Sequence, residues 1–242
     1  MSGHLYNSTI GKVSWFIRRF GASEVALKPL RLAFGRWILP RLHPQTFPFQ
    51  GRTYLCHFAL YNMTWVGERM VELPIAEELL KQHRTCRVLE VGNVLSHYYK
   101  CDHVIVDKFE KGAGVINVDI LDYKDPEPFD LVISVSTFEH IGFDDESPTS
   151  SGIRILAAIK HCRQLLTKDG RLIITFPTGY NPELDELLRS GGLGASQLHF
   201  LVRTGVRKWK GCDLSTALSS PYRSRFPYGN AVVIAEFGAI GR

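Results

Sequence analysis

Short runs of apolar, mostly β-branched residues alternate with helical or polar segments from about residue 84 to the end of the chain. Near-continuous apolar runs of this length are typical of strands that are covered on both faces. Strands that alternate with helical segments indicate an α/β domain built on a mostly parallel sheet. The runs that predict strands are Arg87–Val91, His103–Val106, Val115–Val118, Leu131–Val135, Leu172–Phe176 and Ala231–Phe237.

Helical spacing of apolar residues is clearest between the fourth and fifth predicted strands, where the segment ends at the stop signal Lys168-Asp169-Gly170. Helices are expected over Leu73–Gln82, around the stripe of Ile155, Ile159, Cys162 and Leu166, and over Pro182–Arg189. Only 11 residues, Gly92 to Asp102, connect the first two strands. That length is close to the minimum of about 10–12 residues for a parallel crossover, so any helix there has at most about two turns.

The first 50 residues differ in character from the rest. Segments 12–20 and 25–39 mix bulky apolar residues with Arg and Lys, and three prolines follow before residue 49. One interpretation is a helical arm packed on the domain. The other is a basic amphipathic segment that lies on an anionic membrane or on a lipid-linked substrate. The sequence therefore predicts an N-terminal arm over residues 1–50 and an α/β domain over residues 51–242.

Positive charge is concentrated at the same end of the chain. Residues 1–60 hold eight Lys or Arg against one acid, a net charge of +7, whereas the whole chain carries +5. The remaining residues therefore carry a net charge of −2. This division disfavours a uniformly basic face, so no nucleic-acid partner is expected.

The cysteines and the hydropathy of the chain indicate in which cellular compartment the protein is expected. The five cysteines are odd in number and include no C-x-x-C pair, which disfavours a disulfide framework and a thiolate zinc site. The longest uncharged stretch, Thr53–Gly67, has 15 residues and is too short to span a bilayer. We expect a reducing cytoplasm, with peripheral contact to the inner face of a membrane through residues 1–50 as the alternative. The oligomeric state stays open.

Acidic residues end three successive predicted strands. The segment VLEVGN (Val88–Asn93) passes from Glu90 directly into a glycine turn, at the edge where parallel sheets bind ligands. Asp107 ends the second strand, where a carboxylate can accept both hydroxyl protons of a ribose. Asp119 ends the third, in a position suited to an exocyclic amine of a base. Each acid alone is equally consistent with a cap or a turn, but their order and spacing together indicate a nucleoside pocket.

Residues 84–240 resemble a class I S-adenosylmethionine-dependent methyltransferase. The segments that carry this resemblance are VLEVGN, VIVDKFE (104–110), INVDILDY (116–123), FDLVISVSTFEHIG (129–142) and LLTKDGRLIITFPTG (165–179). The segments ERMVELPIA, FEHIG and GYNPELD look more loosely like bacterial members associated with glycan and lipid modification. The resemblance implies a Rossmann-like sheet, mostly parallel with an antiparallel final strand and with helices on both faces. It also implies S-adenosyl-L-methionine as the cofactor.

The resemblance further assigns residues to the methyl donor. Those implied to contact it are Glu90, Gly92, Asn93, Asp107, Asp119, Ser134 and Ser136. The first three would surround the methionine moiety and the ribose, the two aspartates would take the ribose hydroxyls and the adenine amine, and the serines would lie near the sulfonium.

The loop after Gly92 departs from the family pattern acid-x-G-x-G-x-G, because Asn93, Val94, Leu95 and Ser96 follow the glycine. A dinucleotide is disfavoured by the same departure, since a pyrophosphate needs the later glycines for close backbone approach. The methyl donor carries no phosphate and can tolerate a bulkier loop. A catalytically silent cofactor-fold binding subunit is nevertheless an alternative interpretation.

Glu139 and His140 follow the fourth strand, beside the expected methyl group. An alcohol must lose its proton as it attacks the methyl carbon, and a histidine with an ordinary pKa of about 6.5 can accept that proton near neutral pH. His140 is the predicted base, with Glu139 orienting it or binding the acceptor. A role of His140 as a helix cap or pocket wall is equally consistent with the pattern, and His97 is a second candidate.

The acids Asp144, Asp145 and Glu146 could hold Mg²⁺, but three acids in a row are more often solvated, and no metal is predicted. Aromatic and polar residues at 180–182 and 221–230 suit the apolar face and hydroxyl rim of a sugar. The sequence therefore predicts a methyltransferase acting on a hydroxyl of a sugar, glycolipid or similar small molecule. Another acceptor class, such as a quinone, lipid or amine, is the alternative.

Overall fold

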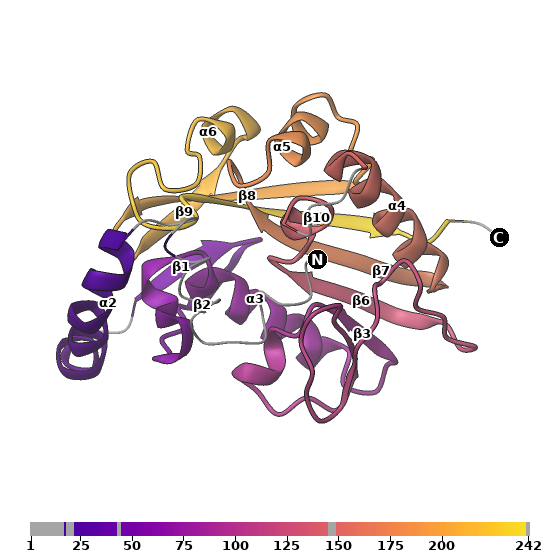
Figure 1. Ribbon diagram of the computed structural model, residues 1–242, viewed down its shortest axis with the longest axis horizontal. Helices are drawn as coiled ribbons and strands as arrows, with labels where there is room; N and C mark the ends of the chain where they lie inside the picture. The colour runs from indigo at the N-terminus through magenta and orange to yellow at the C-terminus, as the bar shows by residue number, and fades with distance from the viewer. Residues whose placement is uncertain (1–16, 18–21, 43–44, 145–148, 241–242) are drawn as a thin grey trace.

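The computed structural model describes residue 17 and residues 22–42, 45–144 and 149–240. Its centre is an eight-stranded sheet in the order β5-β4-β3-β6-β7-β10-β8-β9 (Figure 1). The strands are β3 (Val88–Val91), β4 (Val104–Val106), β5 (Val115–Ile116), β6 (Phe129–Val135), β7 (Leu166–Pro177), β8 (Gln197–Gly205), β9 (Lys208–Cys212) and β10 (Ala231–Gly238).

Strand directions confirm the predicted fold class. The pairs from β5 through β7 are parallel, whereas β10 is antiparallel to both of its neighbours, β7 and β8. β8 therefore runs in the same direction as β7, and only the final strand β10 and the added strand β9 oppose the rest of this sheet. The α/β sheet is mostly parallel, with an antiparallel final strand.

Both faces of the sheet are covered, which accounts for the continuous apolar runs of its central strands. One face packs against α3 (Arg69–Gln82) and the hairpin β1 (Thr46–Phe49)–β2 (Arg52–Leu55). The opposite face packs against α4 (Ser151–Gln164) and α5 (Pro182–Arg189), and the short α6 (Leu214–Leu218) lies nearby in Figure 1. Successive residues of β6 point to opposite faces, as strand geometry requires.

Helix α3 begins at Arg69, four residues before the predicted start, so Pro74 lies inside it rather than in its first turn. A proline has no N–H to donate to the carbonyl four residues earlier, which here belongs to Met70. The Met70 carbonyl instead accepts from the backbone N–H of His57 at 2.9 Å. This contact from outside the helix explains why α3 continues through the proline.

Two other connections bear on the predictions. The link between β3 and β4 contains only a 3₁₀ turn, η5 (Leu95–His97), within the length limit that its 11 residues set. Leu166, which we placed on the helical stripe, instead begins β7 and pairs with Phe129. The strands β8 and β9 were not predicted, because near the sheet edge their polar and apolar residues are mixed.

The N-terminal part is partly helical. Helix α2 (Ala22–Ala33) continues into the π-helical turn η2 (Phe34–Ile38) and the 3₁₀ turn η3 (Leu39–Arg41), whereas residues 12–20 other than Ile17 lie outside the described residues. The boundary placed at residue 50 falls in the turn of the β1–β2 hairpin, and Phe47 is fully buried against the sheet. No described helix has the length and apolar character needed to cross a membrane.

A buried arginine in β8 joins the sheet to the 3₁₀ segment η4 (Tyr61–Val66). The Arg203 guanidinium donates to the carbonyls of Val66 at 2.6 Å and Trp65 at 3.2 Å, and its centre lies 4.7 Å from the Phe226 ring centroid. Burial lowers the pKa of Arg203 to about 10. The side chain therefore provides donors for carbonyls that would otherwise be buried without partners.

Replacing Arg203 with alanine should lower the free energy of unfolding by about 2–4 kcal/mol, because buried carbonyls lose their donors and a cavity forms. Chemical denaturation of the full chain measures this loss. The Lys208→Ala variant, at an exposed position in β9, is the matched control and should change stability by less than about 0.5 kcal/mol. Equal denaturation midpoints for the two variants would contradict this role of Arg203.

Candidate functional site

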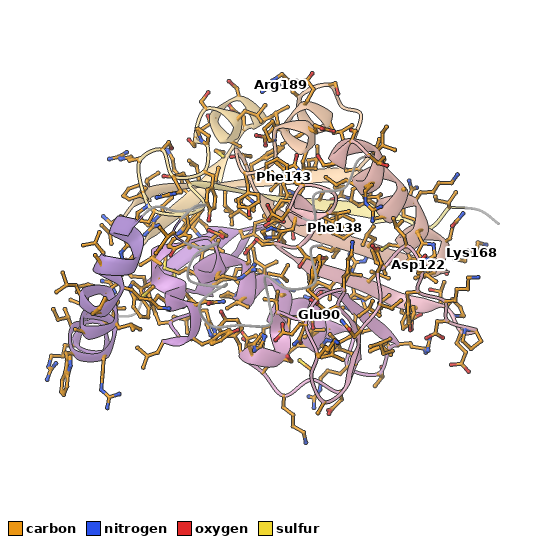
Figure 2. The ribbon with its side chains drawn as sticks, in the orientation of Figure 1. Glu90, Asp122, Phe138, Phe143, Lys168 and Arg189 are labelled. Atoms are coloured by element: carbon orange, nitrogen blue, oxygen red, sulfur yellow. The ribbon has the colours of Figure 1, made fainter. Side chains whose placement is uncertain are left out.

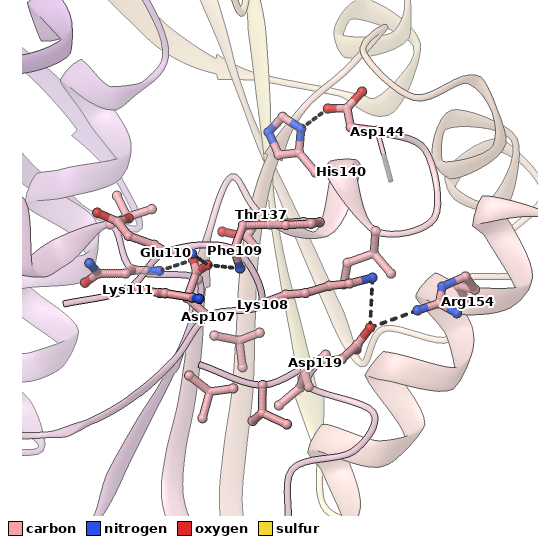
Figure 3. A pocket seen from close by; sticks show the side chains of 18 residues that line it. Asp107, Lys108, Phe109, Glu110, Lys111, Asp119, Thr137, His140, Asp144 and Arg154 are labelled. Atoms are coloured by element: carbon pink, nitrogen blue, oxygen red, sulfur yellow. Dashed lines mark hydrogen bonds and ion pairs between the residues drawn. The ribbon is translucent and has the colours of Figure 1, made fainter. Parts of the chain in front are cut away.

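A cavity of about 650 Å³ opens at the carboxyl ends of β3, β4 and β5 (Figure 3). It lies where the strand order reverses, with β4 on one side of β3 and β6 on the other, the place at which open parallel sheets bind ligands. The lining residues are 91–94, 106–111, 118–120, Thr137, His140, Ile141, Asp144 and Arg154. Of the residues predicted to bind a nucleoside, Gly92, Asn93, Asp107 and Asp119 are among them.

Glu90 does not line the cavity but lies behind its first loop, within the body of the molecule (Figure 2). Its Oε1 accepts from the backbone N–H groups of Val94 at 2.8 Å and Leu95 at 2.7 Å. Its Oε2 lies 2.8 Å from Nε2 of His103. The fully buried carboxylate thus fixes the shape of the loop, a different position from the ligand contact that the resemblance implied.

Gly92 has to be a glycine for two reasons. Its φ of +88° is in the left-handed region, and a Cβ atom there would lie 2.1 Å from Oγ1 of Thr137. After it, the Asn93 N–H donates to Oδ2 of Asp107 at 2.9 Å. The N–H groups of residues 93–95 are therefore all bonded to protein carboxylates and do not bind a phosphate. The loop then has no need of the further glycines that would let a phosphate come close to its backbone.

Asp107 ends β4 and points into the cavity. Its Oδ1 accepts from the N–H groups of Phe109 at 2.8 Å and Glu110 at 2.6 Å, and its Oδ2 accepts from Asn93. Each carboxylate oxygen can accept two hydrogen bonds. Oδ2 therefore retains the capacity for a ligand hydroxyl, which is less than the two hydroxyls that we assigned to this carboxylate.

Asp119 is bound in an ion-pair cluster at the opposite wall (Figure 3). Its Oδ2 lies 3.1 Å from Nζ of Lys108 and 3.0 Å from a guanidinium nitrogen of Arg154. Partial burial raises the pKa of Asp119, but the Leu121 N–H and the two cations outweigh it and hold this pKa below its ordinary value. Nε of Arg154 is buried with no hydrogen-bond partner among the described residues, and the guanidinium is held in place by Asp119.

Ser134 and Ser136 do not line the cavity. The Ser134 hydroxyl donates to the carbonyl of Val91 at 2.7 Å and ties β6 to β3. The Ser136 hydroxyl donates to Oε1 of Glu72 at 2.7 Å, and its φ of 38° turns the chain after β6. Both serines position the loop, and Thr137, which we did not single out, is the loop residue nearest Gly92 in the cavity wall.

A buried charged cluster supports the same loop from α3. Glu72 is fully buried, accepts from the hydroxyls of Ser136 and Thr175 at 2.7 Å each, and lies 2.8 Å from a guanidinium nitrogen of Arg69. Glu139 is also buried, but its Oε2 has no hydrogen-bond partner in the described part of the chain. Burial raises the pKa of Glu139 to about 7, against the lowering effect of His140. This carboxylate can therefore exchange a proton near neutral pH.

His140 lies at the edge of the cavity with its side chain 40% exposed. Its Nδ1 is 2.5 Å from Oδ2 of Asp144 (Figure 3), and the same oxygen accepts from the Tyr180 hydroxyl at 2.7 Å. Its Nε2 lies 3.8 Å from Oε1 of Glu139, too far for a hydrogen bond. Asp144, rather than Glu139, therefore orients the ring, with Nε2 left to accept a proton.

The environment of His140 shifts its pKa in two directions. Burial lowers the pKa, whereas the Asp144 hydrogen bond and the charges of Glu139 and Asp144 raise it, and the net shift is upward. His97, the second candidate base, lies instead beside Glu110, with Nε2 2.9 Å from Oε1, and stacks on Tyr61. His97 is not part of the cavity wall.

Aromatic residues from the two segments singled out for an acceptor meet beside His140. The ring centroids of Tyr180 and His140 are 4.8 Å apart, and those of Tyr180 and Tyr222 are 5.1 Å apart. Tyr228 continues the row, 6.3 Å from Tyr222. Burial raises the pKa of Tyr222 far above its ordinary value, so its hydroxyl stays protonated.

Glu90, Cys101 and His103 form a group with metal-ligand chemistry, their donor atoms within 4.8 Å of one another. Both oxygens of Glu90 already have partners, however, and burial raises the pKa of the Cys101 thiol to about 11. A protonated thiol is a poor zinc ligand. Asp144 is bound to His140 and Tyr180, and Asp145 and Glu146 lie outside the described residues.

No family model matches this sequence, and no curated protein matches it significantly. Several solved structures with a similar fold are described as methyltransferases. One from Archaeoglobus fulgidus, a SAM-dependent methyltransferase, is 16% identical with a TM-score of 0.43, covering 74% of this chain and 98% of its own. A TehB-like SAM-dependent methyltransferase from Corynebacterium glutamicum is 16% identical with a TM-score of 0.40, covering 70% and 87%.

A third structure is the N-methyltransferase NodS from Bradyrhizobium japonicum in complex with S-adenosyl-L-homocysteine. It is 15% identical with a TM-score of 0.38, and the match covers 72% of this chain and 91% of NodS. None of the three reaches a TM-score of 0.5. What this chain binds therefore has to follow from its own residues.

Replacing Asp144 with asparagine should lower the pKa of His140, because the carboxylate that raises it is removed while burial of the ring remains. NMR titration of the imidazole resonances measures this shift. A raised pKa stabilises the fold below the ordinary histidine pKa of about 6.5. The loss of unfolding free energy in the variant should therefore shrink as the pH rises through the pKa of His140.

Asp122→Asn serves as the control for this titration, because Asp122 is exposed and is not part of the cavity wall (Figure 2). Its His140 titration should match that of the unmodified protein. An unchanged His140 pKa in the Asp144 variant would show that Asp144 does not govern the ring.

Proposed function

We propose that this cavity binds S-adenosyl-L-methionine and that the protein transfers its methyl group to a hydroxyl of a sugar, glycolipid or related small molecule. The observation that carries the proposal is the pairing of two features. A cavity that suits a nucleoside lies between Asp107 and Asp119, and a histidine oriented by Asp144 stands at its edge.

The cavity has the size and polarity that an adenosine moiety needs. Its volume of about 650 Å³ lies within the range of small-molecule sites, roughly 300–1,000 Å³. Val118 and Ile120 provide an apolar surface for a base, and Oδ2 of Asp107 accepts a ribose hydroxyl. A dinucleotide is disfavoured, because the loop N–H groups that would bind its pyrophosphate are bonded to Glu90 and Asp107.

The proposed reaction is an in-line displacement. The bound donor supplies an electrophilic methyl group on a sulfonium. As the acceptor oxygen forms its bond to the methyl carbon, the carbon–sulfur bond breaks and a neutral thioether leaves. Nε2 of His140 takes the hydroxyl proton, while Asp144 keeps the ring oriented through Nδ1. Alignment of the reacting atoms supplies much of the remaining acceleration.

The row of tyrosines supports a ring-shaped polar acceptor. The buried Tyr180 is in edge-to-face contact with His140 and with Tyr222, and Tyr222 is in the same contact with Tyr228. Tyr222 and Tyr228 are half-buried and present aromatic surface to an acceptor. Such a surface fits the apolar face and the hydroxyl rim of a sugar. A hydroxyl held against these rings would lie on the same side as the proposed base.

An amine acceptor is the second candidate, and Glu139 is the observation that favours it. The carboxylate is buried, one of its oxygens has no partner among the described residues, and its pKa is about 7. A cationic amine could donate to that oxygen and lose its proton there before attack. A third outcome is a protein that binds the donor without turning it over.

Replacing Asp107 with alanine should weaken binding of S-adenosylhomocysteine at least tenfold, because a charge-assisted hydrogen bond contributes about 1.5–3 kcal/mol. Calorimetric titration measures the affinity. The same change also frees the N–H groups of Asn93, Phe109 and Glu110, so the loop itself could alter.

A second ligand distinguishes loss of the ribose contact from a change in the loop. The unmodified protein should prefer S-adenosylhomocysteine over an analogue without ribose hydroxyls, and the Asp107→Ala variant should lose that preference. Asp122→Ala is the control and should keep it. A variant that binds weakly but still distinguishes the two ligands would contradict the ribose contact.

Replacing His140 with alanine should lower turnover by about 10²–10⁴-fold, the usual contribution of a positioned base. Donor affinity should change little. Turnover of the unmodified protein should rise with pH through an apparent pKa above 6.5, because the base must be neutral and its pKa is raised. The variant should lose this part of the pH profile.

Glu139→Gln distinguishes the two acceptor classes in the same assay, with panels of sugars and of amines as acceptors. With a hydroxyl acceptor, His140→Ala should be the more damaging change. If Glu139→Gln abolishes methylation of an amine while His140→Ala retains most of it, the amine interpretation is correct. Donor binding without turnover on either panel would instead indicate a silent binding protein.

A further inference from the structure

The helical segment of residues 22–42 exposes an unusual amount of apolar side chain. Leu30 is 68% exposed, Trp37 59% and Ile38 48%, and Leu27 and Leu42 are also exposed. Figure 1 shows α2 at one end of the molecule, projecting away from the sheet. We call these five side chains the apolar patch.

The same segment already uses its other side to pack on the domain. Leu39 is buried against Met63 and Trp65, with Leu32 and Phe34 beside them. A Cβ atom on Gly35 would lie 2.1 Å from the Trp65 ring, so this glycine allows close contact with the indole. These contacts attach the segment to the domain without the five side chains of the apolar patch. The patch is therefore exposed and not needed for attachment.

Basic side chains are interleaved with the apolar patch. Residues 22–42 contain Lys28, Arg31, Arg36 and Arg41 and only one acid. Lys28, Arg36 and Arg41 are exposed, and the guanidinium centre of Arg36 lies 5.8 Å from the Trp37 ring centroid. Bulky apolar residues with a tryptophan among cations are typical of segments that lie in the interface of an anionic bilayer.

We propose that residues 22–42 bind the surface of an anionic lipid bilayer, with the apolar patch inserted at the level of the headgroups and the four cations facing the lipid phosphates. The positive charge of this segment favours an anionic bilayer over a second copy of the chain as the partner. A second copy of the chain would bring the same net positive charge against itself, whereas an anionic surface is complementary. This inference does not depend on the proposed methyl transfer.

Flotation of the full chain with vesicles tests the proposal. The protein should bind vesicles of phosphatidylcholine mixed with phosphatidylglycerol, should bind vesicles of phosphatidylcholine alone much more weakly, and should dissociate at high salt. Trp37→Ser should weaken binding roughly tenfold through lost apolar contact. Arg36→Glu should weaken it by about tenfold or more, because each charge near the surface contributes.

Matched changes elsewhere provide the controls. Ile153→Ser removes a side chain that is 63% exposed on α4, and Lys160→Glu reverses an exposed charge on the same helix. Both controls should bind the mixed vesicles as the unmodified protein does. Equal midpoints of chemical denaturation for all variants confirm that each is folded.

Three results would overturn the proposal. They are no binding to the mixed vesicles, equal binding to neutral vesicles, and binding that Trp37→Ser and Arg36→Glu leave unchanged. Sedimentation equilibrium tests the alternative that a second copy of the chain covers the apolar patch. Self-association that Trp37→Ser abolishes, in a protein that ignores vesicles, would show that a second copy covers the patch.

Discussion

Two carboxylates, of the buried Glu90 and the half-buried Asp107, hold the backbone at the carboxyl edge of the sheet, and the cavity depends on them. Glu90 and Asp107 together accept five backbone N–H groups, those of Asn93, Val94, Leu95, Phe109 and Glu110. A hydrogen bond to an ionised acceptor contributes about 1.5–3 kcal/mol, which offsets much of the cost of burying the charge. The two loops that form one wall of the cavity are therefore ordered by the protein itself. This is how a loop with a single glycine can still present a regular binding surface.

A third carboxylate, that of Glu72, performs the same task on the other side of the site. Glu72 connects α3 to the loop after β6 and to β7 through Ser136 and Thr175, with Arg69 as its counter-ion. Glu139 is the exception among these buried acids, because one of its oxygens has no partner in the described chain. The contrast separates acids whose hydrogen bonds support the structure from an acid that keeps an unused acceptor oxygen.

The central strands were predictable because both of their faces are buried, which leaves an uninterrupted apolar run in the sequence. The strands β8 and β9, of which β9 forms the sheet edge, were not, because their mixed polarity resembles that of a loop. Among the site residues, Gly92, Asn93, Asp107 and Asp119 reach the cavity as expected from their places at strand ends.

Other site residues could not be placed from the sequence. Side chains alternate along a strand, so Glu90 points away from the face that Leu89 and Val91 share, and only the folded loop reveals what it binds. Asp144 became the partner of His140 through a short turn whose geometry no periodicity describes. Lys108 and Arg154 come from two separate segments of the chain. Their ion pairs with Asp119 depend on the tertiary structure and could not be predicted from the sequence. Helix α3 begins four residues earlier than predicted, and this also depends on a tertiary contact. The backbone N–H of His57, which is outside the helix, donates to the carbonyl of Met70.

The position of β10 has a consequence for how the chain is made. Residues 231–238 insert between β7 and β8, so the β8–β9 hairpin has no place in the sheet until they have been synthesised. A growing chain that ends before residue 231 would present two unpaired strand edges, a structure prone to pairing with other chains. The sheet can therefore be completed only after residue 238 has been synthesised, and a chain that stops before residue 231 would lack the strand that joins β7 to β8.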